Sequence, residues 1–175
     1  MYIAKIDNSG IFQWVRSAGT PYHDYGYAVN CDSNGNVYVG GYYHDYTIDL
    51  GPIHLTSPSN GSNMYLAKLN SNGDWIWARN SNVTYNNSIN SISFDSIGNP
   101  IVTGHFFNSL ILGTTTLTGY GSADIFVAKI SASGNWIWAN KAGGTNVNDD
   151  DCGDVIKRDI NGDFYVTGYA TGSTK

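Results

Sequence analysis

Hydrophobic and polar residues alternate in short runs along the chain, and turn-forming residues separate these runs. In "YLAKLNSNGDWIWARN" (65–80), two alternating runs flank a short Asn/Ser/Gly segment. A period of two residues is typical of β-strands, and a glycine between two strands supplies the positive φ that a short hairpin loop needs. The segment therefore predicts a β-hairpin.

This hairpin pattern occurs three times, as "AKIDNSGIFQW" (4–14), "AKLNSNGDWIW" (67–77) and "AKISASGNWIW" (128–138). A second block alternates with it, as "CDSNGNVYVGGYY" (31–43), "FDSIGNPIVTGHF" (94–106) and "RDINGDFYVTGYA" (158–170). The second block also predicts a hairpin, in which an Asp side chain accepts hydrogen bonds from turn amides two residues further on. The chain is therefore an internal repeat with a period of about 62 residues.

Each period holds four short antiparallel strands, which is the composition of a β-propeller blade. We predict an all-β fold, a β-propeller of four-stranded antiparallel blades that is circularly offset and amounts to about three blades. Residues 1–175 form one propeller segment: 1–18 are the third and fourth strands of a first blade, 26–80 a second blade, 88–142 a third, and 153–175 the first two strands of a further blade. The tryptophans recur because each blade must bury a large side chain against the next. All five lie in fourth strands, at Trp14, Trp75, Trp77, Trp136 and Trp138.

Composition and charge narrow the function. The chain has 41% hydrophobic and 14% aromatic residues, and its acidic residues are all Asp, which suits strands and turns. A net charge of −5 with nine Lys and Arg argues against a nucleic-acid partner. The sequence has no run of 18 apolar residues, so membrane insertion is not expected, and a signal peptide is not expected within this chain. Cys31 and Cys152 occupy non-equivalent repeat positions, which predicts free thiols.

The pattern Asp-x-x-Gly-Asn-x-Tyr-Val-Thr-Gly, the segment "LGTTTLTGYGSADIFVAKI" (112–130), the Gly-Asn-x-x-Trp-Ala motif and "AGG" resemble the SBBP family, a bacterial β-propeller repeat of large extracellular proteins. The resemblance covers essentially the whole chain. It departs at Pro100 and at 47–63, so we expect the connection at 47–63 to differ in shape from its counterpart. The resemblance implies a secreted or cell-surface protein with an adhesive or scaffolding role, and it brings no catalytic residues.

Enzymatic alternatives have weaker support. "KIDNSGIFQWVR" (5–16) is similar to the tryptophan-docking motif of quinoprotein propellers, but Asn70 and Ser131 replace Asp7 in the other copies and the spacing is one residue short. A propeller hydrolase or lyase needs carboxylates or histidines that converge near the axis, and the sequence offers no Glu and no evident His pair. We predict no enzymatic activity and no cofactor.

The long connections between strands are the expected binding surface. Because strands run antiparallel, the connections at 18–25, 43–63, 80–88, 106–124 and 143–152 emerge on one face, and variable loops on a rigid scaffold carry binding residues. Tyrosine beside Asp and Asn suits contact with carbohydrate or protein. The predicted function is a non-catalytic extracellular binding or adhesion module with a glycan or protein ligand, and the alternative is a structural spacer. The candidate ligand-binding residues are Tyr22, His23, Asp24, Tyr43, His44, Asp45, Tyr46, Tyr85, Phe107 and Tyr120.

An acidic cluster is a separate candidate. Asp149, Asp150 and Asp151, with Asp154 nearby, could hold a cation, and the alternative is a solvated acidic loop. The Asp-x-Asn-Gly segments are predicted to be turns, because a calcium loop of the hand type also needs a distant Glu.

Ring closure poses the last question. Three blades fall below the four to eight that propellers use. The sequence favours a segment of a longer propeller, whose remaining blades belong to the same chain. The alternatives are a homodimer in which the two chains complete a six-bladed ring, and an open arc.

Overall fold

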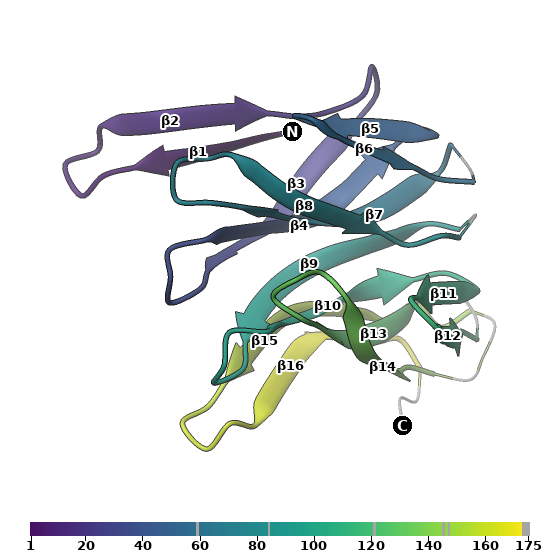
Figure 1. Ribbon diagram of the computed structural model, residues 1–175. Helices are drawn as coiled ribbons and strands as arrows, with labels where there is room; N and C mark the ends of the chain where they lie inside the picture. The colour runs from purple at the N-terminus through teal and green to yellow at the C-terminus, as the bar shows by residue number, and fades with distance from the viewer. Residues whose placement is uncertain (59, 84, 121, 145, 147, 173–175) are drawn as a thin grey trace.

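The computed structural model describes residues 1–172 except 59, 84, 121, 145 and 147. This part of the chain folds into β-strands and turns without a helix, and all the strand pairs are antiparallel (Figure 1). The predicted all-β fold is confirmed.

Two complete four-stranded blades form the centre of the molecule (Figure 1). In each blade the strands pair in the order first, second, third, fourth, and the first strands of neighbouring blades contact one another. The second blade consists of β3 (Asp24–Cys31), β4 (Val37–His44), β7 (Ser62–Leu69) and β8 (Trp75–Asn80). The third blade consists of β9 (Asn87–Phe94), β10 (Pro100–Phe106), β13 (Asp124–Ile130) and β14 (Trp136–Ala142).

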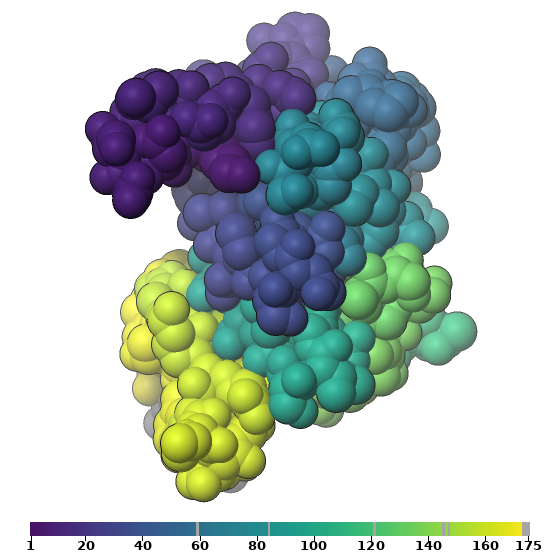
Figure 2. All heavy atoms as spheres, turned by 60° about the vertical axis from the view of Figure 1, so that its left-hand side comes forward, coloured from purple at the N-terminus to yellow at the C-terminus, as the bar shows by residue number. Residues whose placement is uncertain are grey.

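A half-blade lies at each end of this pair. Figure 2 shows the N-terminal half-blade in purple and the C-terminal half-blade in yellow, at the two ends of an arc. The N-terminal half-blade contains β1 (Tyr2–Ile6) and β2 (Phe12–Ser17), and the C-terminal one contains β15 (Cys152–Arg158) and β16 (Phe164–Tyr169). The arc therefore ends in a pair of third and fourth strands on one side and a pair of first and second strands on the other.

The turns within hairpins follow the predicted chemistry. One carboxylate oxygen of Asp32 accepts the backbone N–H groups of Asn34 and Asn36, both at 2.9 Å, and Gly35 has a φ of 77°. Asn70 uses its side-chain oxygen in the same way in the turn between β7 and β8. A short polar side chain at the start and a glycine near the end therefore define each turn.

The connections at 43–63 and 106–124 are not variable loops, so this prediction is wrong. Each contains a small hairpin, β5 (Thr47–Leu50) with β6 (Ile53–Thr56), and β11 (Ser109–Leu112) with β12 (Thr115–Thr118). The two hairpins share one form, with turn glycines at φ 62° (Gly51) and 63° (Gly113), so the hairpin part of the connection does not differ in shape. Alternate aliphatic residues of these hairpins are buried in the core, at Ile48, Leu50, Leu110 and Leu112.

The contacts between blades use a repeated tryptophan and arginine. The indole N–H of Trp14 donates to the carbonyl of Ser71 at 3.1 Å, and that of Trp77 donates to the carbonyl of Ala132 at 3.1 Å. Arg16 Nε donates to the Gly73 carbonyl at 2.9 Å, and Arg79 Nε to the Gly134 carbonyl at 2.7 Å. The fourth strands β2 and β8 therefore each bind the outer turn of the next blade, as predicted for these two tryptophans.

The remaining tryptophans differ from the prediction. Trp75 and Trp136 lie against Gly51 and Gly113, the turn glycines of the inserted hairpins of their own blades. Trp138, the third copy of Trp14 and Trp77, is 36% exposed at the end of the third blade. Trp138 occupies the same repeat position as Trp14 and Trp77, but the described residues contain no outer turn that packs against it.

Candidate functional site

A cluster of exposed tyrosines lies on the inner strands of the second blade. The rings of Tyr25 and Tyr27 stack with centroids 5.7 Å apart, and Tyr42 on the neighbouring strand lies 5.0 Å from Tyr25 and 5.7 Å from Tyr27. His23 extends the cluster, with its ring 6.4 Å from that of Tyr25. We call these four residues the tyrosine cluster.

The local strand geometry explains the cluster. Tyr25 and Tyr42 are directly paired across β3 and β4, so their side chains leave the sheet on the same face. A register shift between Gly26 and Ala28 places Tyr27 at a bulge, beside the other two rings. Burial, and then the hydroxyl of Tyr27, raise the pKa of Tyr42 to about 12. The Tyr42 phenol therefore remains a neutral hydrogen-bonding group at physiological pH.

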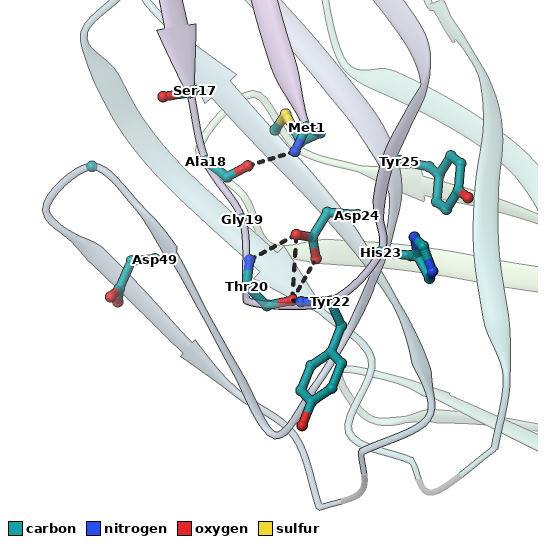
Figure 3. Close-up of a pocket in the computed structure, with 11 residues that line it drawn as sticks. Met1, Ser17, Ala18, Gly19, Thr20, Tyr22, His23, Asp24, Tyr25 and Asp49 are labelled. Atoms are coloured by element: carbon teal, nitrogen blue, oxygen red, sulfur yellow. Dashed lines mark hydrogen bonds between the residues drawn. The ribbon is translucent and has the colours of Figure 1, made fainter.

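An open hollow lies next to the cluster (Figure 3). Its volume is about 820 Å³, and the loop at 18–25, the N-terminal residue and the hairpin β5–β6 form its walls. Figure 3 shows Asp49 on one side of Asp24, and His23 and Tyr25 on the other side. Three predicted residues, Tyr22, His23 and Asp24, are therefore brought to one place.

Asp24 stabilises the loop at 18–25. Its carboxylate accepts the backbone N–H of Thr20 at 2.7 Å and the hydroxyl of Thr20 at 3.1 Å (Figure 3). The Thr20 hydroxyl oxygen in turn accepts the backbone N–H of Tyr22 at 3.0 Å. These bonds fix the loop and hold Tyr22 beside His44, with the centroids of the two rings 6.1 Å apart.

The other predicted residues are more scattered. Tyr43 is fully buried, and its hydroxyl accepts a hydrogen bond from Asn80 at 2.9 Å, so it is a core residue and its prediction as a ligand contact is wrong. Asp45 is partly buried and Tyr46 is exposed, both just before the inserted hairpin β5–β6. The other three predicted residues belong to the third blade or to the connection before it, at Tyr85, Phe107 and Tyr120.

Tyr27 and Tyr42 lie within β3 and β4, outside the predicted connections, and Tyr25 lies at the end of the connection 18–25 but was not among the candidates. A comparison of equivalent repeat positions could have found them. Ser88 and Cys152 stand where Tyr25 does, and Asn90 and Asp154 stand where Tyr27 does. A tyrosine pair that appears in only one blade has no role in the repeated architecture, and that is the signal for a specific function.

A thiol and an imidazole lie close together where the third blade contacts the C-terminal half-blade. Cys152 Sγ lies 3.5 Å from His105 Nδ1 and 3.4 Å from Asp154 Oδ1, and Asn90 donates to the sulfur at 3.0 Å. Burial, and then Asp154, raise the pKa of the Cys152 thiol to about 12, and burial lowers the pKa of His105. A nucleophilic cysteine needs the opposite shift, so this pair is a neutral packing contact at physiological pH. Both cysteines are free, as predicted, with Cys31 exposed and Cys152 buried.

The acidic cluster accepts hydrogen bonds from its own loop. Asp151 accepts the backbone N–H groups of Gly144 at 2.6 Å and Thr171 at 3.0 Å, and Asp149 accepts that of Asn146 at 3.2 Å. Within the described ranges, no group of three His, Cys, Asp or Glu side chains is arranged to hold a metal ion. The carboxylates of Asp149 and Asp151 therefore have a structural role in closing the loop.

Comparison with known proteins agrees with the fold. No protein-family model matches the chain. The chain is 26% identical, over 201 aligned residues, to an uncharacterized WD repeat-containing protein of Acanthamoeba polyphaga mimivirus. The alignment covers 97% of this chain and 14% of that protein. The repeated four-stranded sheets and this similarity together define the chain as a β-propeller repeat protein. The described residues contain no helix that could span a membrane.

Proposed function

We propose that the chain is a non-catalytic interaction module that binds a protein partner through the tyrosine cluster and the adjacent Tyr22. The single observation that carries the proposal is the exposure of the stacked rings, with Tyr25 at 40% and Tyr27 at 53%. Tyrosine supplies large contact areas at a low cost in side-chain entropy, and its hydroxyl offers a hydrogen bond. A rigid blade presents these rings ready for contact.

The charge around the cluster suggests the chemistry of the partner. Asp24 and Asp49 line the hollow next to the cluster, where His54 lies 2.6 Å from Asp49, and the whole chain carries a net charge of −5. Cations bind favourably over the faces of aromatic rings, and nearby carboxylates strengthen that attraction. A partner segment that presents Arg or Lys beside apolar residues fits this surface.

The cellular setting forms part of the proposal. The SBBP resemblance of the repeats supports a secreted or cell-surface protein, and the relative of which this chain matches 14% supports a module within a larger assembly. The neutral thiol and imidazole at Cys152 and His105 support a role without catalysis.

A binding experiment tests the proposal. The full chain is used to select binders from a displayed random-peptide library and, in parallel, is applied to an oligosaccharide array. The double variant Tyr25→Ala with Tyr27→Ala should weaken the selected peptides about tenfold or more, since buried tyrosines are frequent hot spots. Tyr165→Ala, which removes an exposed tyrosine of the C-terminal half-blade, is the control and should change little. Selection of glycans instead of peptides, or equal effects of the two variants, would contradict the proposal.

A further inference from the structure

A similar hollow lies at each of two successive contacts between blades. Its walls are the end of a fourth strand, the turn of the inserted hairpin in the next blade and the outer turn of that same blade. The first interblade hollow, between the first and second blades, has a volume of about 480 Å³ and is lined by Arg16 and Trp75 among others. The second interblade hollow, between the second and third blades, has a volume of about 490 Å³ and is lined by Arg79 and Trp136 among others. All the walls of the second hollow belong to the two complete blades and the connection between them.

Equivalent residues build both hollows, so the repeat forms the same frame twice. A turn glycine of the inserted hairpin, Gly51 or Gly113, lies against the indole of the tryptophan. The arginine Nε donates to the carbonyl of Gly73 at 2.9 Å in the first hollow and of Gly134 at 2.7 Å in the second. These contacts hold an indole and a guanidinium in fixed positions on the walls.

The two arginines differ in how many of their five N–H groups are used. Arg16 donates from Nη1 to the Val15 carbonyl and from Nη2 to the Asn72 carbonyl, both at 3.1 Å. Arg79 donates from Nη1 to the Ala78 carbonyl at 2.7 Å, and its Nη2 has no acceptor among the described residues. Arg79 therefore keeps free N–H groups on both terminal nitrogens.

The free end of Arg79 lies at the wall of the second hollow. A Cβ atom added at Gly134, which also lines this hollow, would lie 3.2 Å from Arg79 Nη2. Arg79 forms no ion pair with any described residue, and the described lining of the hollow includes no acidic side chain. A guanidinium binds a carboxylate through two parallel N–H groups. The second hollow is therefore suited to an anionic group.

The other side chains of the second hollow suit a sugar. Trp136 lines it partly buried, and the exposed Asn82, Thr114 and Asn135 bring amide and hydroxyl groups. The C–H groups of a pyranose ring pack against an aromatic ring, and its hydroxyls form hydrogen bonds with amides and hydroxyls. The volume of about 490 Å³ lies within the range of small-molecule sites, roughly 300–1,000 Å³. One cation among neutral polar side chains indicates a sugar with a single acid group on each ring.

The first hollow differs from the second by one charge. Asp74 lines the first hollow at the position that Asn135 has in the second. Its carboxylate repels an anionic ligand. The two hollows thus share one frame, but only the second favours an acid.

We propose that the second interblade hollow binds a uronate, a sugar that carries a carboxylate, as part of an oligosaccharide. Arg79 binds the carboxylate, Trp136 packs against the pyranose ring, and the amides of Asn82 and Asn135 bind hydroxyls. The site is separate from the tyrosine cluster, and it does not depend on the protein partner proposed there.

A pair of probes that differ only in charge is the first test. The full chain is titrated in a calorimeter with trigalacturonate and with its methyl ester, which has the same rings without the negative charge. The acid should bind about tenfold or more tightly than the ester, because only the acid pairs with the guanidinium. Equal affinities, or no binding of the acid, would overturn the proposal. Hexa-aspartate that binds as tightly as trigalacturonate would overturn the assignment to a sugar.

A charge placed in the hollow locates the site. Asn135→Asp gives the second hollow the carboxylate that the first one has at Asp74, so the turn accepts this residue. It should weaken trigalacturonate about tenfold or more, because a like charge then faces the ligand. Asn72→Asp makes the same change in an exposed turn outside the second hollow and should leave the affinity unchanged. Equal losses in the two variants would place binding elsewhere.

The two arginines provide the last control. Arg79→Gln and Arg16→Gln each remove hydrogen bonds between two blades, but only Arg79→Gln should abolish the preference for the acid over its ester. A loss of the same size in both variants would show that the contact between blades, rather than the Arg79 guanidinium, controls binding. The double variant Tyr25→Ala with Tyr27→Ala should retain trigalacturonate binding, so the failure of one site is distinguishable from that of the other.

Discussion

The two contacts between blades use the same side chains but differ in completeness. At both, an indole N–H and an arginine Nε bond to carbonyls of the next outer turn, at distances from 2.7 to 3.1 Å. Trp77 is buried within a core that also includes inner-strand residues of the second and third blades, whereas Trp14 is only partly buried against its core. Among the described residues, no inner hairpin of the first blade covers the contact made by Trp14.

This difference indicates that the two hairpins of a blade contribute differently to the contact between blades. The outer hairpin carries the directional contacts, and these form wherever the repeat occurs. The inner hairpin excludes water from the contact, and burial is the larger contribution to stability. Stability should therefore be unequal along the arc, greatest between the second and third blades.

The largest expected effect is that of Trp77→Ala. Removing a buried tryptophan from a packed core costs about 3–5 kcal/mol, whereas Trp14→Ala should cost about 1–2 kcal/mol because its ring is partly solvated. Urea unfolding of both variants, monitored by circular dichroism, measures the difference. Equal losses would show that the inner hairpin adds nothing to the contact.

The glycines of the outer turns give a smaller effect of the same kind. Gly134 and Gly10 have φ values of 87° and 83°, so an alanine at either position costs about 1–2 kcal/mol of backbone strain. A Cβ at Gly134 would also press on Trp77, whereas the space around Gly10 is open, so Gly134→Ala should cost about 1 kcal/mol more. The difference between the two unfolding free energies measures packing on the turn alone. Gly98 also has open space around it and a φ of 83°, so Gly98→Ala is the control and should lower the unfolding free energy as much as Gly10→Ala does.

Much of this architecture was predictable because the repeat places equivalent residues in register. The antiparallel blades, the Asp32 turn and the packing of Trp77 all follow from sequence positions that recur. The hairpins β5–β6 and β11–β12 were missed although Ile48 and Leu50 alternate with polar residues; in β11 the apolar Ile111 between Leu110 and Leu112 obscures the alternation. Their strands are only four residues long, and a period of two is difficult to recognise over so short a run.

The candidate site was less predictable, for a reason visible in β4. Tyr42 and Tyr43 are adjacent, and successive side chains of a strand point to opposite faces. Tyr42 joins the tyrosine cluster and Tyr43 fills the core. The sequence alone does not say which face is inward in the last residues of a strand, and the bulge at Tyr27 changes the alternation again. A shift of one residue along a strand reverses which side chains face outward, so the exposed tyrosines could be identified only from the structure.

The ion pairs of the two complete blades provide the finest comparison. Burial by itself raises the pKa of Asp95, but the Lys129 ammonium and the amides of the turn lower it to about 2. The pKa of Asp32 is also lowered, but there burial is opposed first by the side chain and backbone of Asn36, and Lys68 contributes least. Lys129 lies 2.7 Å from its aspartate and Lys68 lies 3.8 Å from its own, which accounts for the difference.

The smallest predicted effect is therefore on the pH dependence of stability. A carboxyl with a lowered pKa stabilises the fold above its ordinary value of 3.8, and this stabilisation is lost as the pH falls toward about 2. Lys129→Met should flatten the dependence of the unfolding free energy on pH between these values, whereas Lys68→Met should leave most of it, because the turn amides still stabilise the Asp32 carboxylate. Urea unfolding at a series of acidic pH values measures both slopes. Equal flattening by the two substitutions would mean that the lysines, rather than the turn, hold both carboxylates in their charged form.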